Sequence, residues 1–426
     1  MLKTPIARGV ALATLGATLA IPTMAQAAFV EDTKAGLELR NFYFNRDFRQ
    51  DNLTSANQSK QEEWAQGFIL RVESGYTEGT VGFGVDALGL LGVKLYSSED
   101  TAGSGLMPSS FGNEAPDDFS EFGLTAKAKL SETVLKVGTL QLKNQAIGTS
   151  DSRLLPQVMQ GAQLVSKEIK DLTLEAGYAN RINHRDSTNY QVMAVNTGGR
   201  RGITIDAGAT NESDEFVFLG GNYKLMENLT AGYYYSNLED LYKQHSYNLV
   251  HVLPLGDKQS LKTDLRYARS TDDGSSNVDN KALGAMVTYS LSGHSIGLGY
   301  QKMSGDTGFA YLAGATDPFL VNYVQINDFA NEDEKSWQAR YDFNFASIGI
   351  PGLTFMTRYV TGDNFERSAG VEGKEWERDM DIAYTFQEGA LKNLNLKWRN
   401  ATARSNGTGN DINENRLIAS YTIPLM

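Results

Sequence analysis

Apolar and polar residues alternate along most of this chain of 426 residues. In the stretch NLNLKWRNAT (393–402), leucine and tryptophan hold every second position, and asparagine, lysine and arginine hold the positions between them. A β-strand sends successive side chains to opposite faces of its sheet, so one face here is apolar and the other carries Lys397 and Arg399. Segments with the helical period are few by comparison. The pattern therefore predicts an all-β protein.

Eighteen segments are expected to form strands. Fourteen of them alternate, at residues 35–44, 67–76, 123–130, 133–142, 172–178, 228–236, 260–268, 282–291, 295–302, 336–345, 353–361, 379–386, 394–402 and 415–425. Four more are expected at 81–95 and near 157–165, 215–225 and 242–253. An even number of antiparallel strands lets both ends of a barrel-forming chain lie on one side of a membrane.

The connections between these segments fall into two classes that alternate along the chain. Short ones include LSE, LMEN and LSGH. Longer polar or Gly-rich ones cover 45–62, 97–119, 144–156, 184–214, 269–280, 303–334 and 362–375. Short periplasmic turns opposite long extracellular loops are typical of an outer-membrane barrel, whereas a soluble β-sandwich would show no such alternation.

The N-terminus has the features of a secretory signal peptide. Lys3 and Arg8 precede an apolar run over 10–22, and Ala-Gln-Ala follows at 25–27, which is an A-x-A cleavage pattern. No later segment offers the 18 or more consecutive apolar residues of a transmembrane helix. We therefore expect a signal peptide at 1–27 and one antiparallel transmembrane β-barrel at 28–426, in the outer membrane of a Gram-negative bacterium.

Composition narrows the possible functions. The chain has no Cys, which excludes disulfides and thiolate metal sites, and its formal net charge of −12 argues against nucleic-acid binding. No H-E-x-x-H or Walker-type motif is present. The one G-x-S-x-G match, GHSIG at 293–297, lies at a short turn that leads into a predicted strand, not between a strand and a helix. We therefore expect no catalysis, no metal, no cofactor and only passive transport. The 20 Tyr, 19 Phe and 4 Trp suit the aromatic girdles of a membrane barrel.

Assigning the apolar face of each strand to lipid places basic residues in the lumen, because a charge facing mid-membrane lipid costs about 2–4 kcal/mol. The predicted inward ladder consists of Lys127, Lys129, Arg266, Arg340, Arg358, Lys397, Arg399 and Arg416. Such a ladder would lower the barrier for small anions, and the arginine fork suits carboxylates. Alternatively, these cations only pair with acids on the same face, such as Asp264, Asp342 and Asp381.

Two long loops are candidates for folding into the pore. The loop at 144–161 would place Asp151, Ser152 and Arg153 at the constriction. The loop at 184–214 would follow it, with its Arg-Arg pair at 200–201 as a cationic lip. The alternative is that the loops lie outside the barrel.

Four stretches resemble the outer-membrane carboxylate channels, the OprD-type substrate-specific porins, and the resemblance covers the mature chain. They are WAQGFILRVESGYTEGTVGFGVDALGLLGVKL, SRLLPQVMQGAQLVSKEIKDLTLEAGY, NLEDLYKQHSYNLVHVLPLG and ERDMDIAYTFQEGALKNLNLKWRNAT. The resemblance implies eighteen strands, inward loops that narrow the pore, and a basic ladder that guides carboxylate nutrients along the inward cations named above. The loop around Arg153 matches the family's constriction loop. Met426 departs from the terminal aromatic of outer-membrane proteins in general.

The sequence is also compatible with two other functions, namely a general diffusion porin with little selectivity and an adhesive or structural barrel. The expected partners are small carboxylate substrates, outer-membrane lipid and lipopolysaccharide. We expect a monomer or a weak homotrimer.

Overall fold

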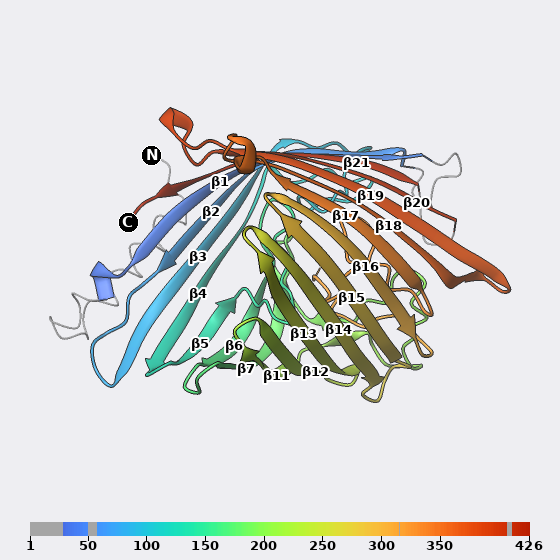
Figure 1. The fold of residues 1–426 in the computed structure, drawn as a ribbon, viewed down its shortest axis with the longest axis horizontal. Coiled ribbons are helices and arrows are strands. Elements are labelled where there is room, and N and C mark those ends of the chain that lie inside the picture. Colours follow the sequence, from blue (N-terminus) through green and yellow to red (C-terminus); the bar gives the residue numbers. More distant parts are fainter. Residues whose placement is uncertain (1–28, 50–57, 315, 407–410) are drawn as a thin grey trace.

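The computed structural model describes residues 29–49, 58–314, 316–406 and 411–426, so the expected signal peptide at 1–27 lies outside the described residues. In the described part, eighteen long antiparallel strands form a closed barrel (Figure 1), which confirms the predicted fold class. They are β1 (Lys34–Phe48), β2 (Lys60–Glu73), β3 (Val81–Tyr96), β4 (Asp118–Leu130), β5 (Thr133–Leu140), β6 (Val158–Ser166), β7 (Leu172–Asn183), β11 (Phe216–Met226), β12 (Leu229–Leu238), β13 (Tyr242–Gly256), β14 (Gln259–Asp272), β15 (Asp279–Leu291), β16 (His294–Ser304), β17 (Lys335–Asn344), β18 (Leu353–Ser368), β19 (Val371–Thr385), β20 (Asn395–Ser405) and β21 (Ile412–Pro424).

Each long strand pairs with the next one along the chain, and β1 also pairs with β21 to close the barrel. Gly36 stands opposite Pro424 in this last pairing, so the two ends of the barrel lie side by side at the edge that bears the short turns (Figure 1). Three two-residue strands, β8 (Tyr190–Gln191), β9 (Met193–Ala194) and β10 (Glu212–Ser213), lie in the connection between β7 and β11.

The two-residue period places the side chains as expected. On β17, Trp337 is 62% exposed on the outer surface, whereas the next residue, Gln338, is buried inside. The helical elements among the described residues are short: an α-helical turn at 29–31 and the 3-10 turns η1 (Phe345–Ile348) and η2 (Gly389–Leu391). No helix in the described ranges is long and apolar enough to cross a bilayer.

Two details of the predicted connections are wrong. The stretch 362–375 is not a long loop, because β18 and β19 extend through it and are joined by only two residues. β12 and β13 are joined by three residues at the long-loop edge, so the alternation of loop lengths is not strict. Outside the hydrocarbon region of the membrane, water can hydrogen-bond to polar side chains. A polar segment can therefore continue a β-strand beyond the membrane surface.

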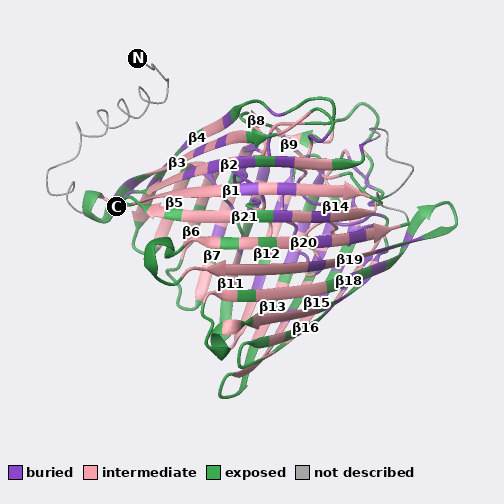
Figure 2. Cartoon of the chain, turned by 90° about the horizontal axis from the view of Figure 1, so that it is seen from above, coloured by how far each residue is buried: buried purple, intermediate pink, exposed green. Residues whose placement is uncertain are grey.

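Long loops fill the barrel toward one end. The connections 97–117, 141–157, 184–215 and 305–334 contribute buried apolar residues that pack against inward residues of the strands. In β1, β2, β20 and β21 the buried positions gather toward the loop-bearing ends (Figure 2). The lumen is therefore narrowed by loops on its extracellular side and lined by strand residues below them.

Candidate functional site

Inward basic residues of four strands form a row along one side of the lumen. Arg340 on β17 stands opposite Arg358 on β18. Arg399 on β20 stands opposite Arg416 on β21. Between these two pairs, β19 presents Asp379 opposite Arg358 and Asp381 opposite Arg399. We call the four arginines together with Lys397 the basic wall.

All four arginines of the basic wall are paired with a carboxylate. Arg340 binds Asp342 through both Nε and Nη2 at 2.7 Å. Arg399 Nε lies 3.0 Å from an oxygen of Asp381, and Arg358 Nε donates to Asp379 at 2.7 Å. The side chain of Arg340 remains 36% exposed and that of Arg399 21% exposed. Both guanidinium groups can therefore still meet a solute in the lumen.

Arg416 differs from its neighbours because its side chain is fully buried. Its Nε donates to Glu414 at 2.6 Å, and its Nη2 donates to the carbonyl of Gln325 at 3.2 Å. Gln325 belongs to the loop 305–334, so Arg416 ties this loop to the barrel wall. A direct contact of Arg416 with a solute would require the loop to move.

Three other predicted ladder residues lie apart from the basic wall. Arg266 on β14 binds Asp264 at 2.9 Å, and its guanidinium lies 4.0 Å from the ring centroid of Phe319. Lys127 on β4 is buried and binds Asp86 at 2.5 Å. Lys129, two residues further toward the short-turn edge, forms no ion pair within the described residues.

The predicted constriction residues meet the basic wall at one small cavity. Asp151, Ser152 and Arg153 line it together with Lys397 and Arg399, and its volume is about 170 Å³. Asp151 accepts a hydrogen bond at 2.7 Å from Arg40 on β1. Lys397 forms no ion pair in the described part of the chain, so its ammonium group is the uncompensated cation of the wall.

Arg153, which is buried, and Arg185, which is half-buried, lie in the inward loops and form no ion pair among the described residues. Arg153 lies over the ring of Phe44, 4.9 Å from its centroid, and Arg185 donates to the hydroxyl of Ser152 at 3.0 Å. Burial and the charges of Arg416 and Arg185 lower the pKa of Arg153, and burial lowers the pKa of Arg185. Arginine stays protonated in proteins, so both residues carry positive charge. The nearby carboxylates of Glu414, for Arg153, and of Asp186 and Asp317, for Arg185, act on these charges without forming ion pairs with them.

The sequence reasoning missed Arg185 and the role of loop 305–334. Glu377 on β19 is buried and accepts hydrogen bonds from the backbone N–H groups of Gln325, Ile326 and Asn327, at 3.0, 2.9 and 2.8 Å. An acid on an inward strand position was visible in the sequence, but its partner is backbone some 50 residues away. No local pattern indicates such a contact.

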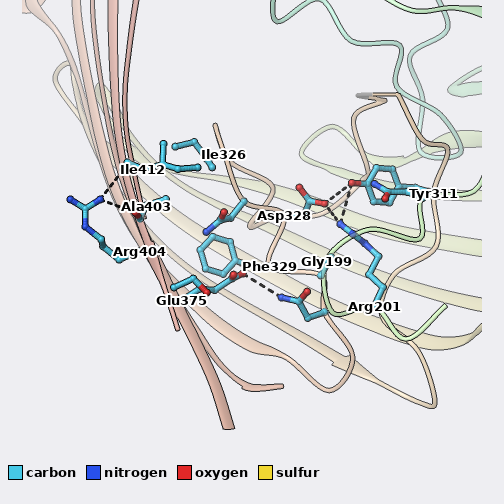
Figure 3. A pocket seen from close by; sticks show the side chains of 15 residues that line it. Gly199, Arg201, Tyr311, Ile326, Asp328, Phe329, Glu375, Ala403, Arg404 and Ile412 are labelled. Atoms are coloured by element: carbon cyan, nitrogen blue, oxygen red, sulfur yellow. Dashed lines mark hydrogen bonds and ion pairs between the residues drawn. The ribbon is translucent and has the colours of Figure 1, made fainter. Parts of the chain in front are cut away.

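A second and larger cavity, of about 340 Å³, lies between the inward loops and β19–β21 (Figure 3). Arg201 forms an ion pair with Asp328 there, and Tyr311 donates to the same carboxylate. Arg201 is therefore buried and neutralised, so its predicted role in a cationic lip is wrong. Arg200 is exposed.

An apolar outer surface, a charged lumen and inward loops in an eighteen-stranded barrel define the class of protein as a porin. The model of a family described as "outer membrane porin, OprD family" matches residues 27–425, and the chain belongs to that family. It is therefore an integral protein of the Gram-negative outer membrane, in a family of channels rather than enzymes.

The relatives agree with this assignment. The chain is 39% identical over 417 residues to Porin-like protein GalP of Pseudomonas putida, covering 97% of each chain. It is 37% identical over 425 residues to Porin D of Pseudomonas aeruginosa, covering 93% of this chain and 92% of that one. The crystal structure of Pseudomonas aeruginosa OpdQ matches with a TM-score of 0.86 and 60% identity, covering 94% of this chain and all of OpdQ.

Proposed function

We propose that the protein is a substrate-specific porin for the passive uptake of small carboxylate-bearing nutrients. Solutes pass the inward loops and then move along the Arg/Lys ladder of the lumen. The observation that carries this proposal is the small cavity where Lys397 and Arg399 face Asp151, Ser152 and Arg153. It combines a narrow passage with positive charge that fixed acids do not fully compensate.

The chemistry of this cavity favours a carboxylate over other anions. Arg399 offers a planar set of donors, and Lys397 offers a point charge two residues away on the same face. Arg153 and Arg185 add positive charge from the loop side, and an incoming anion would stabilise the buried guanidinium group of Arg153, which forms no ion pair within the described residues. Because the wall arginines keep their own acids, each binds a passing carboxylate weakly, and a conducting channel requires such weak binding.

One observation favours a second candidate, a general diffusion porin with little selectivity. Arg266, Arg340, Arg358 and Arg399 each have a carboxylate within 3.0 Å. If these pairs cancel the field of the ladder, anions gain little from it. The two candidate functions predict different results when the cations of the small cavity are removed. A substrate-specific porin should lose anion preference and carboxylate uptake, whereas a general diffusion porin should keep both.

Replacing Lys397 and Arg399 together by Ala tests the proposal. We expect carboxylate uptake in liposomes to fall about tenfold, since the loss of two lumen charges raises the barrier by about 1–2 kcal/mol at high effective dielectric. The matched control is Lys167→Ala with Lys170→Ala, which removes two exposed charges at the turn between β6 and β7. Unchanged carboxylate uptake with an unchanged anion preference would favour the general diffusion porin.

A further inference from the structure

Three lysines form a cluster on the outer surface of the barrel, at the extracellular ends of adjacent strands. They are Lys281 on β15, Lys302 on β16 and Lys335 on β17. Each shares its face with an outward side chain two residues away. These are Leu283 and Trp337, which are exposed, and Tyr300, which is half-exposed and packs on Trp337. The cluster therefore lies outside the lumen, and solute passage does not account for it.

The strand register brings the three ammonium groups together. Lys302 stands directly opposite Lys335. Lys281 stands opposite Ser304, so it lies diagonally across from Lys302. Opposite side chains in an antiparallel pair have Cβ atoms about 5 Å apart, and like charges placed there repel each other. The barrel thus holds three cations close together at a cost that a bound anion would offset.

Two acids share the outer face with the cluster, Asp279 beside Lys281 and Asp363 opposite Lys335, but neither forms an ion pair with these lysines within the described residues. Lys281 and Lys302 form no ion pair there, and Lys335 donates only to the amide oxygen of Asn364, at 3.1 Å. The acids nearest to the cluster do not neutralise the three lysines. Asp279 is bound by Arg269, and Asp363 faces Lys335 across β17 and β18 without forming an ion pair.

The position of the cluster relative to the membrane points to a lipid headgroup. The rings of Tyr300 and Trp337 pack together with their centroids 4.4 Å apart. Paired aromatic residues of this kind mark the boundary between hydrocarbon and headgroups. Lys302 and Lys335 lie two residues beyond them, about 7 Å along the strands, and so at headgroup depth. On the hydrocarbon side, Leu298 is 66% exposed.

The charge of the outer surface differs around the barrel. Outward basic residues continue from the lysine cluster in both directions, with Arg269 on β14 and Arg404 on β20. Figure 3 shows Arg404 pointing away from the inner cavity. Each of these arginines is paired with an acid, Arg269 with Asp279 and Arg404 with Asp411. At the same edge of β1 and β2, the acids Asp47 and Glu62 are likewise paired, with Arg49 and Lys60. The lysine cluster therefore differs from its surroundings because its three cations form no ion pair within the described residues.

We propose that Lys281, Lys302 and Lys335 bind the phosphate groups of an outer-leaflet glycolipid, the chemical class to which lipopolysaccharide belongs. Its acyl chains lie against Leu298 and the Tyr300–Trp337 pair, and its phosphates bridge the three ammonium groups. Free phosphate would gain only the screened attraction of exposed lysines, whereas a lipid adds apolar contact on the same surface. This inference does not depend on what passes through the pore.

The test uses the purified full-length barrel in detergent micelles, with diphosphorylated lipid A and chemically dephosphorylated lipid A as probes. Binding is followed by native mass spectrometry. The variant replaces Lys281, Lys302 and Lys335 by Gln. The matched control replaces Lys167, Lys170 and Lys258 by Gln, three exposed lysines at the short-turn edge. Heat-modifiable migration on gels and single-channel conductance verify that each variant is a folded channel.

We expect the protein to bind diphosphorylated lipid A at least about tenfold more tightly than the dephosphorylated form, because the phosphates meet the charges of the three lysines at headgroup depth. The cluster variant should lose this preference and the control should keep it. Equal binding of the two lipids, or a preference that survives in the cluster variant, overturns the proposal. Loss of lipid A from the protein in excess inorganic phosphate, at matched ionic strength, would assign the lysines to free phosphate and also overturn it.

Discussion

At the scale of single residues, the lumen charges come as local pairs. Residues two positions apart on a strand have their side chains on the same face. This spacing brings Asp264 next to Arg266 and Asp342 next to Arg340. Pairing with same-face acids was the alternative that the sequence left open, and it is correct for Asp264, Asp342 and Asp381. The selectivity of the lumen therefore depends on the small excess of positive over negative charge that unpaired residues such as Lys397 leave.

Replacing Asp381 by Asn should increase the anion preference of the channel. The substitution keeps the shape of the side chain but leaves the Arg399 guanidinium without its counter-charge. One extra unit of charge near the path changes the energy of a passing anion by about 0.7 kcal/mol in a water-like dielectric, so we expect about a threefold higher anion-to-cation permeability ratio. Reversal potentials in a salt gradient measure it. Asp363→Asn on the outer surface is the control and should leave the ratio unchanged.

A buried acid of the inward loop gives a prediction about pH. Glu334 accepts hydrogen bonds from Asn331 at 3.0 and 2.8 Å, and burial together with the charge of Glu375 raises the pKa of Glu334 well above its ordinary value. The folded state then holds this proton at pH values where the unfolded state has lost it. The contribution of Glu334 to stability is thus greatest below its unfolded pKa and declines as pH rises toward the folded pKa.

Glu334→Gln should remove this dependence. The variant is expected to melt at a higher temperature than the native protein at alkaline pH, and the difference should shrink at acidic pH. Circular dichroism melts in detergent across a pH series measure the effect. Glu132→Gln in the exposed turn between β4 and β5 is the control. A constant difference across the pH series would contradict the role given to Glu334.

At the scale of elements, the inward loops are held by buried polar contacts with the barrel wall. Loop 305–334 is bound by Glu377 and Arg416, and its Asp317 N–H donates to the Gly148 carbonyl of loop 141–157 at 2.7 Å. Gln157 also donates to the carbonyl of Gly314, at 2.7 Å. The loops therefore support one another, and the constriction is a property of the set rather than of one loop.

Glu377→Ala should loosen loop 305–334. Three half-buried backbone N–H groups lose their acceptor, and a typical hydrogen bond contributes about 1 kcal/mol, so we expect about 1–3 kcal/mol of lost stability. Single-channel recordings should show larger and noisier currents, and the melting temperature should fall. Glu372→Ala, on the exposed end of the β18–β19 hairpin, should change neither. A steady current of unchanged size would be inconsistent with Glu377 anchoring the loop.

At the scale of the whole molecule, the acidic net charge of −12 and the basic lumen wall are compatible because they occupy different places. The lumen cations lie on the inner face of the strands, whereas many acids, such as Asp100, Asp118 and Asp333, are exposed at the loop-bearing edge. A permeating ion responds mainly to the charges nearest its path, because salt screens the more distant ones.

Selectivity should therefore depend on ionic strength. The Debye length falls from about 10 Å at 0.1 M salt to about 3 Å at 1 M, so the field of the wall reaches across the lumen only at low salt. We expect anion preference in 0.1 M potassium chloride and close to none in 1 M, measured by reversal potentials at a fixed concentration ratio. A preference that is equal at both concentrations would show that steric contacts, not charge, select the permeating ion.

Much of this architecture could be predicted from the sequence because it depends on local patterns. The two-residue period assigns strands and faces, lipid excludes charge from the outer face, and positions two apart pair on the inner face. Strand number, barrel class and the inward direction of Lys397, Arg399 and Arg340 follow from these rules. The inward fold of the loop around Arg153 was also expected.

The remaining features were decided by contacts between distant parts of the chain. Arg201 is neutralised by Asp328, 127 residues away, and Glu377 binds backbone about 50 residues away. The lysine cluster exists only because β16 and β17 pair in a particular register across a loop of 30 residues. The sequence by itself determined which residues face water and which face lipid, since that depends on neighbours along one strand. Only the tertiary structure decided which charges meet, because barrel closure and loop packing bring them together.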